Sequence, residues 1–585
     1  MSLHHSGLGG VSPPGLRWVS SHLWRIEHAF ERARAAGKAE DDTRIRIFFV
    51  AALFAAGFLT LAVGATRAAL FADAGRSGAA WAGGGTARAD IVDRNGELLA
   101  ADLPHYGLYI DSSEVWDVDE TRRSIRRALP EVSPQRLEKA LHYGRRMYVI
   151  GGLTPAQKAG VHELGLPGVI FDPEQRRVYP LGHTASHLLG FADTGGQGLA
   201  GAELALNDTI RGAVANHQPV ALSIDLRVQA ALEDEVRKAA LEFHPKGAVG
   251  IVTNVHTGEI LGLASYPDFD PNRPGDFSDA DRLDRAAASV YEMGSTFKAF
   301  TVAIGLDTGV ATPNSTFDAR QPYQLGYRTI HDYHATHKIL TLVEVFQHSS
   351  NIGTAKLAES IGGDRLSSYF EALGLTKPAK VELEESAYPL TPKKWDMDAV
   401  ASTSFGHGIA VSPLAVARAM GALLNGGTLV PLTIRKLAPG DRPDGPRVVS
   451  ERTSAEMLQI MRANVTGGSG KSANVPGLSV GGKTGTGEKY EPSIRGYSHD
   501  KQVSSFAATF PTDGSVDAPR YFVMILLDEP HGDSATYGFS TGGWVAAPGV
   551  GRVINRIAPF LGVPRRYEPK LITAQADPAT IGEGL

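Results

Sequence analysis

The chain has 585 residues, with 58 Lys and Arg against 63 Asp and Glu, which gives a formal net charge of −5 at pH 7. This near balance provides no electrostatic attraction to nucleic acid, and a composition of 43% hydrophobic and 21% charged residues excludes wholesale disorder. The absence of cysteine excludes disulfides, thiolate metal sites and a cysteine nucleophile, so any covalent catalysis must use another side chain.

The first apolar segment is long enough to cross a membrane. Residues 47–66 contain no charged side chain, and a helix of this length spans roughly the 30 Å of a bilayer core. Basic residues are more frequent before this segment than after it, which predicts a cytoplasmic N-terminus. A cleaved signal peptide is the alternative, with residues 72–74 resembling a cleavage site, but the preceding segment is too long for an ordinary signal. We therefore expect an uncleaved anchor.

The next part of the chain carries no recognisable catalytic pattern. Residues 75–89 are rich in Gly and Ala and are typical of a flexible linker. Beyond them, strand-like runs at 106–110 and 147–150 alternate with helical stretches such as 124–129. We interpret this region, up to about residue 225, as a support domain.

The C-terminal part has the order strands, helices, strands. Residues 228–242 are predicted to be a helix that packs on a β-hairpin formed by 248–255 and 258–264. Further elements are expected as helices at 296–306, 342–361 and 413–424, and as strands at 502–510 and 521–527. This order predicts an α+β or mixed domain with an antiparallel sheet.

A serine and a lysine stand three residues apart at the start of an apolar helix. Ser295 and Lys298 are expected on one helical face, where burial would lower the lysine pKa and let a neutral amine accept the serine proton. The helix N-terminus would add hydrogen-bond donors and positive potential. Taken alone, the pattern fits equally an N-cap serine beside a solvated lysine.

Two further polar patterns follow. Ser349 and Asn351 could point into one cleft, relay a proton and hold a substrate amide, although an isolated Ser-Ser-Asn is also typical of a turn or helix cap. In the run Lys483, Thr484, Gly485 and Thr486, strand alternation puts both threonines on one face, and the glycine permits close backbone approach. Such a strand could hold a carboxylate.

Two segments also fit patterns of other sites. Residues 477–484 fit the nucleotide-binding P-loop pattern, but that loop must open a helix, and the Gly-Thr-Gly that follows is poor helix material. His331, His334 and His337 could suggest a metal, yet their spacing lacks a His-Glu-x-x-His pattern, and packing in a loop or cleft is favoured. We therefore expect neither nucleotide nor metal nor other cofactor.

Together the three patterns are more specific than any one of them. Ser-x-x-Lys, Ser-x-Asn and Lys-Thr-Gly in this order characterise β-lactamases and penicillin-binding proteins. Residues 291–298 resemble the nucleophile segment of class B penicillin-binding proteins, with Met293 where proline is frequent. Segments similar to the family's non-catalytic landmarks occur at 91–96, 177–180, 198–203 and 269–272. The resemblance covers residues 88–565.

Within that family, the division-specific (FtsI-type) members are the most similar. Residues 349–356, 405–408 and 483–486 carry this likeness, and Gly487 stands where alanine is usual. The elongation-specific relatives share the anchor, pedestal and trio, so they remain the alternative.

The resemblance implies a domain organisation for the whole chain. It is an α+β protein with a single N-terminal transmembrane helix, a periplasmic pedestal and a transpeptidase domain, the last a serine β-lactamase-like antiparallel sheet packed with helices. We expect a cytoplasmic tail at 1–44, the transmembrane helix at 45–66, the pedestal or dimerisation-like domain at 67–225, the transpeptidase domain at 226–565 and a C-terminal tail at 566–585.

The resemblance also assigns roles to the residues of the trio. Ser295 would be the nucleophile that attacks the penultimate D-Ala carbonyl of a stem peptide, and Lys298 the base for acylation. Ser349 and Lys483 would relay protons to the leaving amine, while Asn351 would hold the acylated peptide. The backbone N–H groups of Ser295 and Thr486 would form the oxyanion hole, and the Thr484 and Thr486 hydroxyls on either side of Gly485 would bind the substrate carboxylate.

The implied activity is septal D,D-transpeptidation in the bacterial inner membrane. Its partners would be peptidoglycan stem peptides, β-lactams as inhibitors, the glycosyltransferase FtsW and other division proteins, with no nucleic acid. A β-lactam-hydrolysing enzyme and a non-catalytic membrane scaffold are the remaining alternatives. The first is disfavoured because no acidic residue can be assigned as a deacylation base, and the second because all the catalytic side chains are present.

Overall fold

The computed structural model describes residues 54–55, 57–58, 87–325, 328–491, 493 and 496–566. Residues 54, 55, 57 and 58 are helical, while most of the predicted transmembrane helix, the whole 1–44 tail and residues 567–585 lie outside the described residues. Among the helices of the described ranges, none combines the length and apolarity that a membrane crossing requires. The described chain after residue 86 belongs to one compact unit.

A five-stranded sheet is the first element of this unit. Its long strand β2 (Leu98–Asp111) pairs antiparallel with β1 (Ile91–Val92), β3 (Arg146–Leu153) and β4 (Val169–Val178), and β1 pairs parallel with β5 (Val220–Ala221). The strands predicted at 106–110 and 147–150 lie within β2 and β3.

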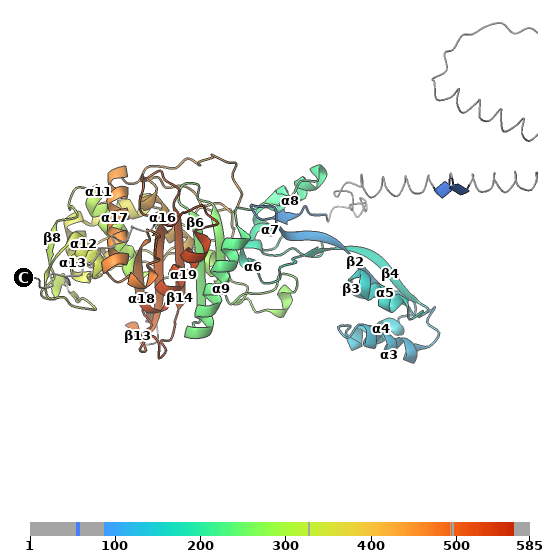
Figure 1. Ribbon diagram of the computed structural model, residues 1–585. Coiled ribbons are helices and arrows are strands. Elements are labelled where there is room, and N and C mark those ends of the chain that lie inside the picture. The colour runs from blue at the N-terminus through green and yellow to red at the C-terminus, as the bar shows by residue number, and fades with distance from the viewer. Residues whose placement is uncertain are drawn as a thin grey trace, which may run out of the picture. The chain divides into compact units, whose positions relative to one another are not determined.

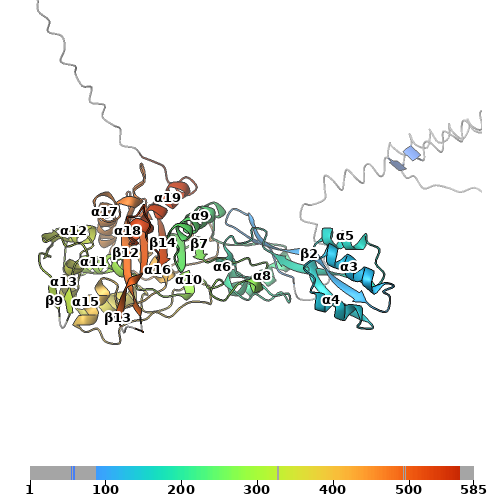
Figure 2. The ribbon, with the colours of Figure 1, turned by 90° about the horizontal axis from the view of Figure 1, so that it is seen from below.

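Three capped helices pack at one end of β2, as Figures 1 and 2 show. They are α3 (Val118–Ala128), α4 (Pro134–Leu141) and α5 (Pro155–His162). Side-chain oxygens of Asp117, Ser133 and Thr154 accept hydrogen bonds at their N-termini, and proline occupies the first helical position of α4 and α5, where its missing N–H costs nothing. A separate small hydrophobic core joins these helices to the strands.

A buried ion cluster ties together segments that the sequence comparison marked as family landmarks. Glu203 accepts from Nε of Arg88 at 2.7 Å and from Nε of Arg177 at 2.6 Å. Arg177 also donates to Asp102 at 3.2 Å, and the Tyr179 hydroxyl donates to Glu203 at 3.2 Å. The Glu203 side chain is fully buried. The short helices α6 (Ser186–Leu189), α7 (Gly201–Ala205) and α8 (Asn207–Ala213) and the 3₁₀ turn η1 (Val214–Asn216) surround this cluster or follow it.

The second sheet is antiparallel throughout, as the sequence predicts. Its order is β12 (Gly481–Glu491), β13 (Gly496–Phe510), β14 (Tyr521–Asp528), β6 (Gly247–Asn254) and β7 (Ile260–Tyr266). The predicted hairpin is β6–β7, and the predicted strands at 502–510 and 521–527 lie in β13 and β14. Because β12 is an edge strand, one side of its backbone is not paired within the sheet.

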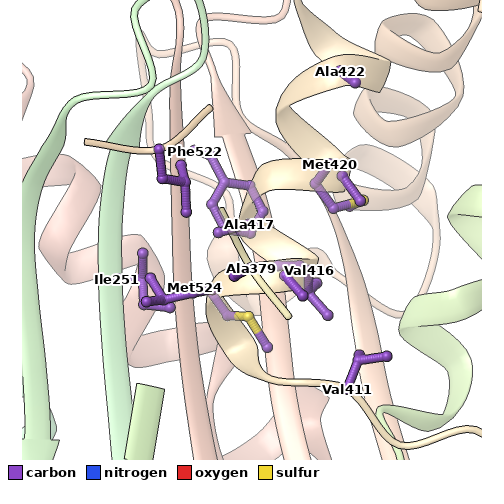
Figure 3. Packing of buried hydrophobic residues seen from close by; sticks show 14 of the residues in the cluster. Ile251, Ala379, Val411, Val416, Ala417, Met420, Ala422, Phe522 and Met524 are labelled. Atoms are coloured by element: carbon purple, nitrogen blue, oxygen red, sulfur yellow. The ribbon is translucent and has the colours of Figure 1, made fainter. Parts of the chain in front are cut away.

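Strand alternation divides the side chains of this sheet between two cores. Ile251 and Met524 belong to the core that contains α16 (Pro413–Leu424), and Figure 3 shows them beside Val416 and Met420 of that helix. Their neighbours Val252 and Val523 belong to the opposite core. That core contains α9 (Leu226–Phe243) and α19 (Ala547–Ile557), which lie on the other face of the sheet (Figure 1).

The remaining helices pack beside the α16 face of the sheet. They are α10 (Arg285–Ala288), α11 (Lys298–Asp307), α12 (Leu342–Gln347), α13 (Asn351–Ile361), α14 (Gly363–Ala372), α15 (Met397–Ser404) and α17 (Glu451–Gly467). The short strands β8 (Thr316–Asp318), β9 (Tyr323–Leu325), β10 (Arg328–Ile330) and β11 (Ile339–Thr341) form two hairpin-like pairs between α11 and α12. The last short elements are the 3₁₀ turns η2 (Pro274–Asp276), η3 (Gly294–Phe297) and η4 (Lys471–Ala473), and α18 (Gly542–Val545).

Two predicted helices differ from those observed. The helix expected from residue 296 begins as the 3₁₀ turn η3, which contains Ser295, and becomes α-helical only at Lys298. The single helix expected over 342–361 is wrong, because it is broken into α12 and α13. Ser349 at the break has φ = +55°, a left-handed conformation that a continuous helix excludes.

Candidate active site

Ser295 lies where the chain passes closest to the edge strand β12. A Cβ atom on Gly294, which has φ = +52°, would lie 2.1 Å from the Thr486 carbonyl oxygen, so only glycine fits there. Ser295 itself is half-buried. Its N–H is among the first donors of η3, which have no partner within the helix. The local fold therefore places a serine and the first backbone donors of η3 near β12.

Lys298 begins α11 and is fully buried. Its Nζ donates to the Asn351 Oδ1 at 2.7 Å, to the Ser349 Oγ at 3.1 Å and to the Ser349 carbonyl oxygen. Burial lowers the pKa of Lys298 to about 7, against an opposing effect from the Asp332 carboxylate. The predicted lowering is confirmed, but the hydrogen-bond partners of Nζ are Ser349 and Asn351 rather than the Ser295 hydroxyl.

Ser349 and Asn351 lie in the break between α12 and α13, here called the SxN turn (residues 349–351). Ser350, the middle residue, caps α13 through a 3.0 Å hydrogen bond from the Gly353 N–H to its Oγ. Ser349 has a left-handed backbone conformation, which ends α12. The side chains of Ser349 and Asn351 both accept hydrogen bonds from Lys298. The prediction that Ser349 and Asn351 point to one place is confirmed.

Lys483 reaches the same hydroxyl from a different element, the edge strand β12. It lies on β12, is fully buried, and its Nζ donates to the Ser349 Oγ at 2.9 Å. It also donates to the Thr484 carbonyl oxygen at 3.2 Å and lies 5.5 Å from the centre of the Phe346 ring. Burial holds the pKa of Lys483 well below its ordinary value, and the charge of Lys298 lowers it further.

Thr484 and Thr486 lie on one face of β12, as predicted from strand alternation. Gly542 of α18 donates its N–H to the Thr486 Oγ1 at 3.2 Å, and a Cβ on Gly543 would lie 3.6 Å from the Thr484 methyl group. Between them, a Cβ on Gly485 would lie 2.6 Å from the Met293 carbonyl oxygen. The glycine therefore allows the segment before Ser295 to approach the strand.

The structure decides against the P-loop interpretation. Lys483 and Thr484 continue a strand that began at Gly481, whereas a P-loop lysine stands at the start of a helix. For the histidine segment, the His337 Nδ1 lies 3.1 Å from the Arg320 carbonyl oxygen, and His334 packs edge-on against Tyr333. In the described part of the chain, no group of three His, Asp or Glu side chains is placed to bind a metal.

Three polar residues near the site were not predicted. Ser469, before β12, lies 2.9 Å from the Thr484 Oγ1. Asp332 contacts the SxN turn. Glu292 accepts hydrogen bonds from the Tyr497 hydroxyl and the Gly408 N–H, each at 3.2 Å, and burial raises its pKa to about 7. Only Glu292, three residues before Ser295, could have been found from its position in the sequence.

The cluster therefore brings together two buried amines, a shared hydroxyl and a nearby serine. Both lysines have a lowered pKa and both bind the Ser349 hydroxyl, so a proton can pass between them through this hydroxyl. The uncovered backbone of β12 and the threonine hydroxyls offer hydrogen bonds to an extended substrate with a carboxylate. These groups are the ones that an acyl-transfer site requires: a nucleophile, a base, a proton relay and donors that bind the substrate.

Comparisons with known proteins agree with this chemistry. Residues 248–548 match the family described as penicillin binding protein transpeptidase domain, and residues 85–213 match the penicillin-binding protein dimerisation domain. The chain is 67% identical to the probable peptidoglycan D,D-transpeptidase FtsI of Caulobacter vibrioides, over 99% of this chain and 98% of that protein. It is 29% identical to the peptidoglycan D,D-transpeptidase FtsI of Escherichia coli, over 83% and 85%.

A solved structure extends the comparison to the fold. The apo crystal structure of penicillin binding protein 3 from Mycobacterium tuberculosis superimposes with a TM-score of 0.63 and 26% identity, covering 82% of this chain and 97% of that one. Fold, site and sequence relatives therefore converge. The chain belongs to the penicillin-binding protein family and contains both its transpeptidase domain and its dimerisation domain.

Proposed function

We propose that this protein is a septal peptidoglycan D,D-transpeptidase, which cross-links stem peptides through a serine acyl-enzyme and is acylated by β-lactams. One observation carries the proposal. The hydroxyl of Ser349 accepts hydrogen bonds from both Lys298 and Lys483, at 3.1 and 2.9 Å, and Lys298 begins the helix that follows the half-buried Ser295. Relatives named peptidoglycan D,D-transpeptidase FtsI support peptidoglycan as the substrate, and the likeness to this type of transpeptidase supports the septal role.

In the acylation step, the Ser295 Oγ attacks the carbonyl carbon of the penultimate D-Ala and passes its proton to the neutral amine of Lys298. The C–N bond to the terminal D-Ala then breaks, and the leaving amine takes a proton delivered through Ser349 and Lys483. The lowered pKa values of both lysines support these roles, because an ordinary lysine is protonated at neutral pH. Free D-Ala and an ester at Ser295 are the products.

The second step reverses the first with a different amine. An amine from a neighbouring stem peptide attacks the ester carbonyl, and the Ser295 oxygen leaves as a hydroxyl, so a cross-link forms. The N–H groups of Ser295 and Thr486 stabilise the oxyanion in both steps. The close approach of η3 to β12 supports this assignment, since it brings the two backbones together. Asn351 holds the amide of the acylated peptide, and the Thr484 and Thr486 hydroxyls bind the substrate carboxylate.

We further propose the domain limits and the location that the sequence predicts. The limits are a cytoplasmic tail at 1–44, a membrane helix at 45–66, a periplasmic pedestal at 67–225, a transpeptidase domain at 226–565 and a tail at 566–585. The family matches at 85–213 and 248–548 support the two folded domains. The uncharged segment 47–66 supports an anchor in the inner membrane. FtsW and other division proteins are the partners that we propose for the anchored protein.

A transfer assay with purified full-length protein tests the activity. A peptide ending in D-Ala-D-Ala is supplied together with a labelled amine acceptor, and both released D-Ala and acceptor incorporation are measured. We expect both products from the wild type and from Ser360→Ala, an exposed serine on α13, and neither from Ser295→Ala. Release of D-Ala without transfer would support a hydrolase instead, and no release from folded wild type would support the scaffold alternative.

Replacement in cells separates the septal from the elongation role. In a bacterium depleted of its own division transpeptidase, the wild-type chain is expected to restore septa and Ser295→Ala is not. Restoration of rod elongation without septation would support the elongation-specific alternative.

A further inference from the structure

The carboxylate of Asp332 binds the SxN turn and the residue that follows it. Its Oδ2 accepts from the Ser350 hydroxyl at 2.8 Å, and its Oδ1 accepts from the Ile352 N–H at 2.9 Å. These two donors stand immediately before and after Asn351. Asp332 belongs to the segment between β10 and β11, so a residue from another part of the chain holds the middle of the turn and the first turn of α13.

The neighbour of Asp332 fixes the Asn351 side chain directly. The Asn351 Nδ2 donates to the His331 carbonyl oxygen at 2.9 Å. With its amide nitrogen held there, Asn351 presents Oδ1 to the Lys298 Nζ at 2.7 Å. The His331 carbonyl therefore determines which end of the Asn351 amide faces the buried lysine.

Asp332 also differs in charge from the other groups around Lys298. Lys298 is fully buried. Two charged groups act on it: the carboxylate of Asp332, in the segment between β10 and β11, and the amine of Lys483, on β12. The Asp332 carboxylate raises the pKa of Lys298, against the larger lowering by burial. Loss of this negative charge would leave the lysine with only polar partners and a second lysine nearby, and would favour its neutral form.

We propose that Asp332 is a positioning residue of the acyl-transfer site, which holds Ser350 and the start of α13 and thereby keeps Asn351 in place beside Lys298. This inference rests on the proposed transpeptidase function. Asp332 does not contact substrate in the proposal, and it acts through Ser350, Asn351 and Lys298. It gives the segment 331–337, which the sequence suggested only as a metal site or loop packing, a role in catalysis.

Acylation by a fluorescent penicillin, followed from pH 5.5 to 8.5, tests this role in full-length Asp332→Asn. The variant keeps the shape and an acceptor for the Ile352 N–H but loses the charge. We expect the acid limb of the acylation rate to move about one pH unit lower, and the plateau rate to fall about tenfold or more as the turn loosens. Asp318→Asn is the matched control, because this exposed carboxylate on β8 pairs with Arg320 and not with the turn.

The outcomes separate this inference from the proposed function. If the wild type is not acylated, the proposed function fails and Asp332 is not in question. If the wild type is acylated while Asp332→Asn keeps both the wild-type midpoint and the wild-type plateau, the positioning role is wrong. If the plateau of the acylation rate falls but the midpoint of its pH profile does not move, the Asp332 charge does not act on the pKa of Lys298, and that part of the inference is wrong. Thermal unfolding of each variant identifies any that does not fold, and Asp332→Glu then provides the charged comparison, with a midpoint expected near that of the wild type.

Discussion

Lys298 and Lys483 donate hydrogen bonds to one oxygen, the Ser349 hydroxyl, at 3.1 and 2.9 Å. One lysine comes from the start of α11 and the other from the edge strand β12, and both side chains are fully buried. Two ammonium groups this close repel one another, and burial disfavours both charges. The arrangement therefore favours a state in which at least one amine is neutral and can accept a proton.

The rate of penicillin acylation should rise with pH through about 7. Burial lowers the pKa of Lys298 to about 7, and below this pH the amine carries a proton and cannot take one from Ser295. Acylation measured in a stopped-flow experiment should therefore be slow at pH 5.5 and approach a plateau near pH 8.5. Burial also raises the pKa of Glu292 to about 7, so this carboxyl could cause the same pH dependence. If the acylation rate of Glu292→Gln still rises with pH through about 7, the dependence belongs to the lysine. A rate that is flat across this range would contradict the assignment.

Replacing Lys483 by methionine should slow acylation by about 10² to 10⁴ without unfolding the domain. The apolar chain of methionine suits the buried position, but the variant loses the donor to the Ser349 hydroxyl and with it the proton path to the leaving group. Time courses of fluorescent-penicillin labelling measure the rate. Lys436→Met, at an exposed position, is the control. A labelling rate within twofold of wild type would rule out a catalytic part for Lys483.

Glu203→Gln should destabilise the protein by about 3–5 kcal/mol, because it leaves the buried guanidinium groups of Arg88 and Arg177 without their carboxylate. Urea unfolding measures the loss. The control is Glu371→Gln, which removes an exposed partner of Lys377 and should cost less than about 1 kcal/mol. Equal losses in the two variants would show that the buried cluster does not stabilise this part of the fold.

Stability should depend on Glu292 in a pH-dependent way. Burial raises the pKa of Glu292 from 4.5 to about 7, so the folded state binds its proton more tightly than the unfolded state does. The stability from the protonated form is present at low pH and is lost as pH rises through about 7. Moreover, the Glu292 Oε2 is buried without a hydrogen-bond partner in the described chain.

Thermal unfolding of Glu292→Gln at pH 5 and pH 8 checks this dependence. The neutral amide should raise Tm relative to wild type more at pH 8 than at pH 5, whereas Glu384→Gln on the exposed surface should show no such difference. If the change in Tm is the same at both pH values, Glu292 does not ionise in the folded protein over this range.

The sequence patterns that are periodic predict the scaffold well. The continuous apolar runs of β6, β7 and β14 follow from burial on both faces of the sheet, and these strands, together with β13, α9 and α16, form as predicted. The three motifs meet because α11, the SxN turn and β12 converge. Their convergence was inferred from the order of the motifs and not from their spacing, since no local rule brings Lys483 to Ser349.

The features that sequence reasoning missed depend on single dihedrals or distant contacts. The periodicity of residues 342–361 continues across the break, so the positive φ of Ser349 leaves no trace in the hydrophobic pattern. The Lys298 amine donates to Ser349 and Asn351 because the turn places those oxygens beside it, and helical spacing from Ser295 gives no indication of these partners. Asp332 was overlooked because its partners, Ser350 and Ile352, lie beyond β11 and α12.

Covalent labelling of the purified full-length protein by a fluorescent penicillin, with mass mapping of the adduct, tests the central claim most directly. The account predicts one adduct on Ser295 and no labelling of a folded Ser295→Ala variant. An adduct on another residue, or no labelling of a well-folded wild type, would contradict the assignment of Ser295 as the nucleophile.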